Sequence, residues 1–156
     1  MDIGSRYAFI SGLRMLSYGD NSRRELTRKL VSKGHKPEYA EAALNKLEEY
    51  GYINDLRYAQ YMVDRLSQTK KMSKRGIRSE LLQKGVNRDI VEQILEETEF
   101  DPVEDITALI QKKYVRYLDS EKGIKKIISA LQRLGYGWSD IQAALNAVDA
   151  EGGFYD

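Results

Sequence analysis

Basic residues concentrate in one segment of this 156-residue chain. Between Arg65 and Arg88 there are eight lysines and arginines against a single acid, Glu80. Two of the arginines, Arg75 and Arg78, fall near the start of a predicted helix, where cations oppose the helix dipole. Residues that break a local stability rule often serve function, so the segment is predicted to bind a phosphate backbone or an acidic protein surface. The alternative is a solvated, lysine-rich loop.

A second basic cluster, Lys112, Lys113 and Arg116, lies in the stretch LIQKKYVRYL. These cations share one side of a predicted helix, with Tyr117 nearby. Cations near a helix C-terminus also complement the dipole, so a structural role and a binding role are equally open here. With Arg57, the two clusters give the candidate binding residues: Arg57, Arg65, Lys70, Lys71, Lys74, Arg75, Arg78, Lys112, Lys113 and Arg116.

Residue patterns typical of catalysis or metal binding are scarce. The chain has no cysteine and one histidine, His35, which excludes thiolate chemistry and argues against an ordinary zinc site. It contains neither a GxxxxGK[ST] loop nor a GxGxxG motif. We therefore expect no catalytic residue, no cofactor and no metal ion, and we expect His35 to lie in a solvated turn.

The composition is that of a folded protein with a solvated surface, 42% hydrophobic and 31% charged. No apolar run approaches the roughly 18–20 residues of a membrane span, and no signal peptide is visible, so we expect a cytoplasmic protein without a membrane partner. The net charge of +1 conceals separate blocks of acidic and basic residues, since residues 89–105 hold eight acids and no base. Either alternating solvated helix faces or one basic and one acidic side of the molecule explains them.

Apolar residues recur with the helical period along the chain. Residues 40–47 and 141–148 each place apolar side chains at i, i+3, i+4 and i+7, and no strand-like alternation is present. Ser22 followed by Glu25 predicts a capping box. The sequence thus predicts an all-α fold.

Aromatic side chains are expected mainly in the core. Tyr58, Tyr61 and Tyr114 are predicted to bury their rings and keep their hydroxyls at the edge, and Trp138 is predicted to pack between helices.

The chain contains an internal repeat. Two sets of residues recur at spacings of 51 and 50, namely Leu30, Leu81 and Leu131, and Gly34, Gly85 and Gly135. The glycines stand where a left-handed C-cap would end a helix. A further helix precedes each copy, over about residues 7–18, 56–68 and 102–118.

The repeat sets the predicted domain organisation. We expect three tandem three-helix, helix-turn-helix-like repeats over residues 1–55, 56–100 and 101–149, followed by a flexible C-terminal tail, 150–156. A unit of about fifty residues is marginal alone, so the repeats should stack into an elongated, curved, solenoid-like array.

Three segments in order carry a family resemblance: SRRELTRKLVSKG at 22–34, DLRYA at 55–59 and IRSELLQKGV at 77–86. With the KKY at 112–114 they resemble the RecX family, regulatory proteins of the recombinase RecA, over about residues 7–148. One departure is that many members carry Gly-Pro before the isoleucine at position 77, where this chain has Ser73 and Lys74 nearby.

The resemblance implies a function. RecX-like proteins lie along the groove of the RecA–DNA filament, inhibit strand exchange and ATP hydrolysis in DNA repair, homologous recombination and the SOS response, and are not enzymes. The implied partners are the RecA filament and single- or double-stranded DNA through or beside RecA, bound by a monomer. A stand-alone helical DNA-binding module that acts without RecA is the alternative, distinguished by DNA binding with a steep salt dependence.

Overall fold

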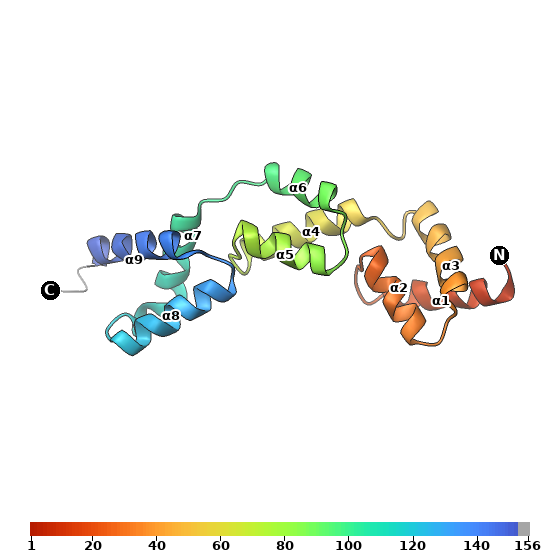
Figure 1. Ribbon diagram of the computed structural model, residues 1–156, viewed down its shortest axis with the longest axis horizontal. Helices are drawn as coiled ribbons and strands as arrows, with labels where there is room; N and C mark the ends of the chain where they lie inside the picture. The colour runs from red at the N-terminus through yellow and green to blue at the C-terminus, as the bar shows by residue number, and fades with distance from the viewer. Residues whose placement is uncertain (153–156) are drawn as a thin grey trace. The chain divides into compact units, whose positions relative to one another are not determined.

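The computed structural model describes residues 1–152, with side chains to residue 149, and this part of the chain is helical without a strand (Figure 1). The predicted all-α class and the three-helix repeats are confirmed. The elements are α1 Ile3–Leu16, α2 Arg23–Ser32, α3 Pro37–Glu49, α4 Asp55–Gln68, α5 Lys74–Gln83, α6 Arg88–Glu96, α7 Pro102–Leu109, the π-helix η1 Ile110–Tyr114, the 3-10 helix η2 Val115–Tyr117, α8 Glu121–Arg133 and α9 Trp138–Gly152. The predicted tail at 150–156 starts inside α9, and residues 153–156 lie outside the described part.

The second helix of every repeat ends in the same turn. Gly34, Gly85 and Gly135 have φ values of 107°, 86° and 95°, a conformation that glycine adopts without a Cβ penalty. In each copy the amide after the glycine donates to the carbonyl of the repeated leucine, over 3.1, 3.1 and 3.2 Å at Leu30, Leu81 and Leu131. This is the Schellman pattern, which confirms the predicted glycine caps and explains why leucine and glycine recur together.

Local sequence also sets the helix starts. Asp2 Oδ1 accepts from the Ser5 amide at 2.9 Å, so α1 begins at Ile3, earlier than the predicted residue 7. The predicted capping box is confirmed, because the Glu25 amide donates to Ser22 Oγ at 3.1 Å and the Ser22 amide donates to Glu25 Oε1 at 3.3 Å.

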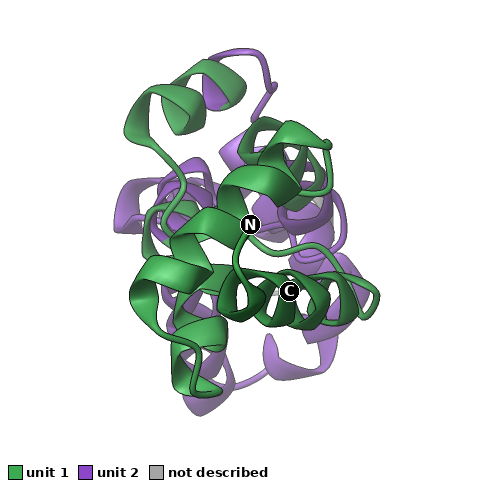
Figure 2. Ribbon diagram, turned by 90° about the vertical axis from the view of Figure 1, so that its right-hand side faces the viewer, with its two compact units in different colours: residues 1–62, 80–94 green, residues 63–79, 95–156 purple. Residues whose placement is uncertain are grey.

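The chain forms two compact units, and the second repeat contributes to both (Figure 2). The first unit joins residues 1–62 to 80–94, and the second joins 63–79 to 95–156. The first contains a buried cluster of Leu26, Leu30, Ala40, Leu44, Leu47 and Ile53. The second contains Ile106, Leu109, Ile110, Ile127, Leu131, Tyr136, Ile141, Ala144 and Val148. Each terminal repeat is thus completed by part of the second repeat.

Both units use one kind of contact, which we call the helix-end junction. It joins the first residues of one repeat's second helix to the last turn of the next repeat's second helix. In the first unit the Ser22 hydroxyl donates to the Lys84 carbonyl. In the second unit the Ser73 amide donates to the Leu134 carbonyl at 2.9 Å. Helix termini carry unsatisfied backbone groups, and each junction satisfies one of them across repeats.

The first junction is polar. Glu25 is 8% exposed and accepts from the Tyr58 hydroxyl at 2.9 Å, while the Lys84 ammonium lies 3.3 Å from its second oxygen. Burial alone would raise the pKa of this carboxyl, but the Tyr58 and Ser22 hydrogen bonds and the Lys84 charge outweigh it and hold the pKa below its ordinary value.

The second junction depends on close backbone approach. A Cβ at Gly76 in α5 would lie 2.5 Å from the Leu134 carbonyl oxygen, and one at Gly135 would lie 2.8 Å from the Gly76 Cα. Two glycines therefore face each other where α5 meets the last turn of α8.

Two aromatic predictions are wrong. Tyr58 is buried as expected, but Tyr61 is 56% exposed and Trp138 is 53% exposed. Trp138 is the first residue of α9 and stands beside a hollow lined by Leu118, Ile124 and Leu145. A side chain at the first position of a helix has neighbours from the helix on one side only. The large apolar surface of Trp138 is therefore not enough to bury it.

Gly76→Ala should lower the free energy of unfolding by about 1–3 kcal/mol, the usual range for overpacking, although alanine favours helices. The added methyl meets a backbone carbonyl, which cannot rotate away as a side chain would. Urea unfolding measures the change. Gly137→Ala is the control, because a Cβ there meets nothing within 4 Å; equal losses for the two variants would contradict the close junction.

The buried Glu25 carboxylate should make the first unit sensitive to acid. Since the folded pKa of Glu25 lies below the ordinary value of a glutamate, its stabilisation is complete above that ordinary pKa and is lost as the pH falls through the folded pKa. Glu25→Gln should flatten the decline in urea-unfolding free energy below about pH 5. Glu41→Gln, on an exposed part of α3, should keep the parental slope; an unchanged slope in Glu25→Gln would contradict the account.

Candidate binding surface

Within the predicted basic segment, a loop of residues 69–73 connects α4 to α5, and hydrogen bonds hold it at several points. The Met72 amide donates to the Leu66 carbonyl at 3.0 Å, and the Ser73 amide is fixed by the second junction. The Tyr136 hydroxyl donates to the Lys71 carbonyl. Burial, with Asp105 and Asp140 nearby, raises the pKa of Tyr136, so the hydroxyl keeps the proton that it donates.

Ser73 accounts for the departure from the usual Gly-Pro. Its hydroxyl accepts from the Gly76 amide at 3.0 Å and caps α5, and the residue is 8% exposed. The turn is therefore closed by a serine cap in place of a proline start.

The structure separates the candidate cations of this loop and of the first turn of α5 by environment. Lys70, Lys74 and Arg75 are exposed, with no ion-pair partner among the described residues. Lys71 is half-buried, has a φ of 54° and places its ammonium 3.8 Å from Asp105. Positive φ in a lysine is uncommon, and the junction contacts maintain it. Lys71 thus helps to hold the loop that presents its neighbours.

The remaining candidates of the second repeat are more dispersed. Arg65 is exposed on α4, and Arg78 is half-buried on α5. Arg57 belongs to the other compact unit, where its guanidinium donates to the Gly51 and Tyr52 carbonyls at 3.3 and 3.5 Å. The site prediction for all ten cations stays a prediction.

The helix predicted over about residues 102–118 is present but is not α-helical throughout. α7 ends at Leu109, and a π turn and a 3-10 turn follow. An uninterrupted α-helix would place Lys113, four residues after Leu109 and seven after Ile106, on the buried face. The π turn inserts one residue, so Tyr114 packs against the core while Lys112 and Lys113 stay exposed.

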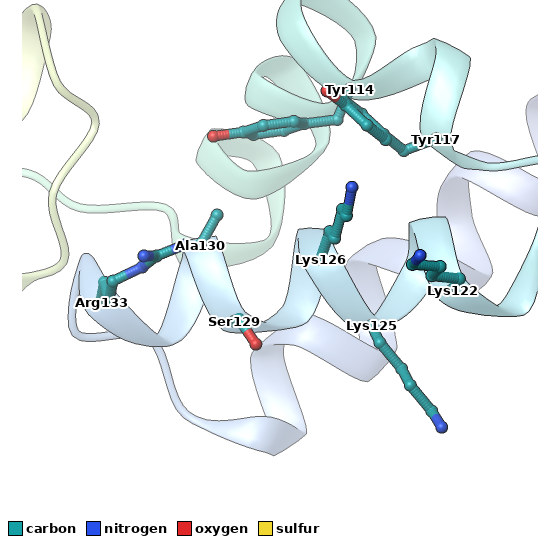
Figure 3. Close-up of a pocket in the computed structure, with 8 residues that line it drawn as sticks. All are labelled: Tyr114, Tyr117, Lys122, Lys125, Lys126, Ser129, Ala130 and Arg133. Carbon is teal, nitrogen blue, oxygen red and sulfur yellow. The ribbon is translucent and has the colours of Figure 1, made fainter.

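The π turn borders a groove, and none of the ten candidate cations lines it. Tyr114 and Tyr117 form one wall, and α8 supplies the other residues: Lys122, Lys125, Lys126, Ser129, Ala130 and Arg133 (Figure 3). The groove has a volume of about 570 Å³. Its sequence signal was the block of seven bases and two acids between residues 112 and 133. Without the π turn, nothing in that block indicates which cations face the tyrosines.

His35 is not the solvated turn residue predicted from the sequence. It is half-buried, and its Nε2 lies 2.9 Å from Ser11 Oγ, so it ties the α2–α3 turn to α1. Among the described residues no group of three or more metal-ligating side chains comes together, and no described helix is long and apolar enough to cross a membrane.

The fold and this surface define a class, a protein of tandem three-helix repeats that presents a fixed cationic loop. Two family models match the chain, the first three-helix domain of RecX over residues 8–47 and the second over residues 54–95. The chain belongs to the RecX family.

Similar proteins include several that are named Regulatory protein RecX. The one from Vibrio parahaemolyticus is 34% identical over 143 residues, which cover 90% of this chain and 91% of that protein. Those from Clostridium tetani and Caldanaerobacter subterraneus are 30% and 34% identical and match 86% and 85% of this chain. The chain spans 63% and 66% of the length of these two relatives.

Solved structures show the same fold. The crystal structure of RecX from Lactobacillus salivarius has a TM-score of 0.72 and 27% identity, and the match covers 94% of this chain and 97% of that one. A second structure, of a regulatory protein RecX, has a TM-score of 0.70 at 24% identity, a likeness of fold alone, over 92% of this chain and 72% of that one.

Charge reversal should separate the two lysines of the loop. Lys71→Glu would set a carboxylate against Asp105 and should destabilise the second unit by about 1 kcal/mol. Lys70→Glu, beside it but exposed, should leave stability unchanged within about 0.5 kcal/mol. Thermal unfolding of both variants tests this, and equal melting temperatures would show that Lys71 has no anchoring role.

Proposed function

We propose that this protein binds the RecA–DNA filament along its groove and inhibits strand exchange and ATP hydrolysis, without catalysing a reaction itself. The observation that carries the proposal is that a member of the RecX family presents exposed cations on the loop before α5 and on the first turn of α5, next to the second junction. The proposal implies a role in DNA repair, homologous recombination and the SOS response. It also implies a cytoplasmic site of action, because RecA and its DNA lie there.

The charge of the loop suits this partner. Lys70, Lys74 and Arg75 are exposed at the N-terminal end of α5, where no carboxylate neutralises them in the described structure. Cations in such a place attract either DNA phosphates or acidic side chains of a protein filament. Because hydrogen bonds already hold the Lys71 carbonyl and the amides of Met72 and Ser73, binding would cost little ordering of this part of the loop.

A repeat protein also suits a repetitive partner. Three copies of one helix-turn unit can make several modest contacts along a polymer, and contacts in one chain reinforce one another. A monomer would suffice for such binding. The second basic cluster, Lys112, Lys113 and Arg116 in η1 and η2, belongs to the same compact unit as the first and adds three exposed cations to it.

A second candidate function is direct DNA binding without RecA. The specific observation in its favour is the basic, tyrosine-lined groove of the third repeat. It is compatible with the first function, since a RecA filament contains DNA, and its consequences are taken up in the next subsection.

The triple variant Lys70→Glu, Lys74→Glu, Arg75→Glu tests the proposal, leaving Lys71 in place to keep the loop. In an assay of RecA, single-stranded DNA and ATP, the parent protein should inhibit hydrolysis at well under one molecule per RecA. The variant should need at least about tenfold more protein, since three charge contacts of roughly 0.5–1 kcal/mol each are lost.

The matched control reverses three exposed cations of the first repeat, Arg6, Arg28 and Lys36. It changes the net charge equally and should inhibit nearly as well as the parent. Equal weakening of both triple variants would show that net charge, and not this loop, governs inhibition. Absence of inhibition by the parent protein would overturn the proposal.

A further inference from the structure

The groove of the third repeat is an internal feature of the second compact unit. Its two walls are joined closely, because Gly123 in α8 lies against the Tyr117 carbonyl, and a Cβ there would clash with that oxygen. The Ser120 hydroxyl caps α8 by accepting from the Gly123 amide at 3.0 Å. The tyrosines of one wall therefore stand at a fixed distance from the lysines of the other.

One face of α8 is cationic along its length. Residues 122, 126, 129 and 133 follow helical spacing and are Lys, Lys, Ser and Arg. Eleven residues of helix span about 16 Å, longer than a single phosphate group. Lys122, Lys126 and Arg133 are exposed and have no ion-pair partner among the described residues. No carboxylate lines the groove, so the site suits a polymeric anion.

The opposite wall is aromatic. Tyr114 and Tyr117 are half-buried, with ring centroids 6.3 Å apart and planes at 52°. The Lys126 ammonium extends toward them and lies 5.8 Å from the Tyr117 centroid (Figure 3). Both rings pack against the core of the repeat, which restricts their rotation. They are thus fixed aromatic surfaces at the edge of a cationic track.

We propose that this groove binds single-stranded nucleic acid, with bases stacked on Tyr114 and Tyr117 and phosphates on Lys122, Lys126 and Arg133. Aromatic surfaces beside a positive track are the common means of holding a strand without sequence preference. An acidic peptide would use the cations but not the rings, and paired bases of a duplex are not available for stacking. Binding to this groove needs no RecA. The inference rests on the proposed function only in naming a RecA filament as the source of the single strand.

The test is a fluorescence anisotropy titration of a labelled oligothymidine with the full chain, repeated at several salt concentrations. The logarithm of the affinity should fall with the logarithm of salt with a slope of about −0.7 per phosphate contact, or about −2 for three contacts. Lys122→Gln with Lys126→Gln should reduce the slope by about 1.4. Lys33→Gln with Lys36→Gln, two exposed lysines of the first repeat, should leave it unchanged.

The stacking part is tested at one tyrosine. Tyr117→Leu should weaken binding roughly tenfold or more and leave the salt slope unchanged, while Tyr117→Phe, which keeps the ring, should bind as the parent does. Circular dichroism confirms that each variant is folded. No binding by the parent, or normal binding by the double lysine variant, would overturn the inference. So would equal competition by polyglutamate together with normal binding by Tyr117→Leu.

RecA inhibition, measured on the same variants, keeps the two proposals apart. A folded groove variant that loses oligonucleotide binding yet still inhibits RecA supports the groove as a nucleic-acid site separate from the inhibitory contact. A parent protein that binds oligonucleotide but never inhibits RecA overturns the proposed function and leaves this inference standing.

Discussion

The helix-end junction is the contact on which the rest of this structure depends. A helix ends with unpaired carbonyls and begins with unpaired amides, and a repeat protein must satisfy them or leave them to water. Here the Ser73 amide donates a hydrogen bond to the Leu134 carbonyl, and the Ser22 hydroxyl donates one to the Lys84 carbonyl. The Schellman turn of each repeat makes these carbonyls available, so one short motif both ends a helix and receives the next contact.

The two junctions do the same work with different chemistry. The first places a buried carboxylate, Glu25, between a tyrosine and a lysine. The second brings the backbones of Gly76 and Gly135 together, where a Cβ on either glycine would meet backbone atoms. A polar junction is sensitive to pH and a glycine junction is sensitive to added volume. The two junctions of the chain are thus sensitive to different changes.

Function follows from what the second junction fixes. It holds Ser73 and, through Tyr136, the carbonyl of Lys71, so the loop between α4 and α5 has a defined path. Lys70 on this loop, and Lys74 and Arg75 at the start of α5, are then presented without a large entropy cost. The π turn does the same for the third repeat, because it turns Tyr114 inward and keeps Lys112 and Lys113 outward.

Much of the fold could be predicted because its signals are local. The spacing of Leu30, Leu81 and Leu131 and of the glycines after them is a property of consecutive residues, and the turns formed as predicted. The elongated, curved array expected of the repeats stays a prediction.

The errors arose where tertiary packing decides. A straight helix over 102–118 fits the local pattern, but the core admits Tyr114 and not Lys113, which forces the extra residue. His35 and Trp138 were misplaced for the same reason, since their neighbours come from other helices. The groove of the third repeat could not be predicted, because it depends on tertiary contacts between its two walls, such as the approach of Gly123 to the Tyr117 carbonyl.

We propose that the second helix-end junction fixes the loop of residues 69–73 and that this loop contacts the filament. Hydrogen exchange resolved at single amides, in the free protein and on the RecA–DNA filament, tests it most directly. The account predicts that the Ser73 amide exchanges as slowly in the free protein as the core amides of α8, and that residues 69–75 gain protection on the filament. Rapid exchange at Ser73 in the free protein, or unchanged exchange over 69–75 in the bound protein, would contradict it.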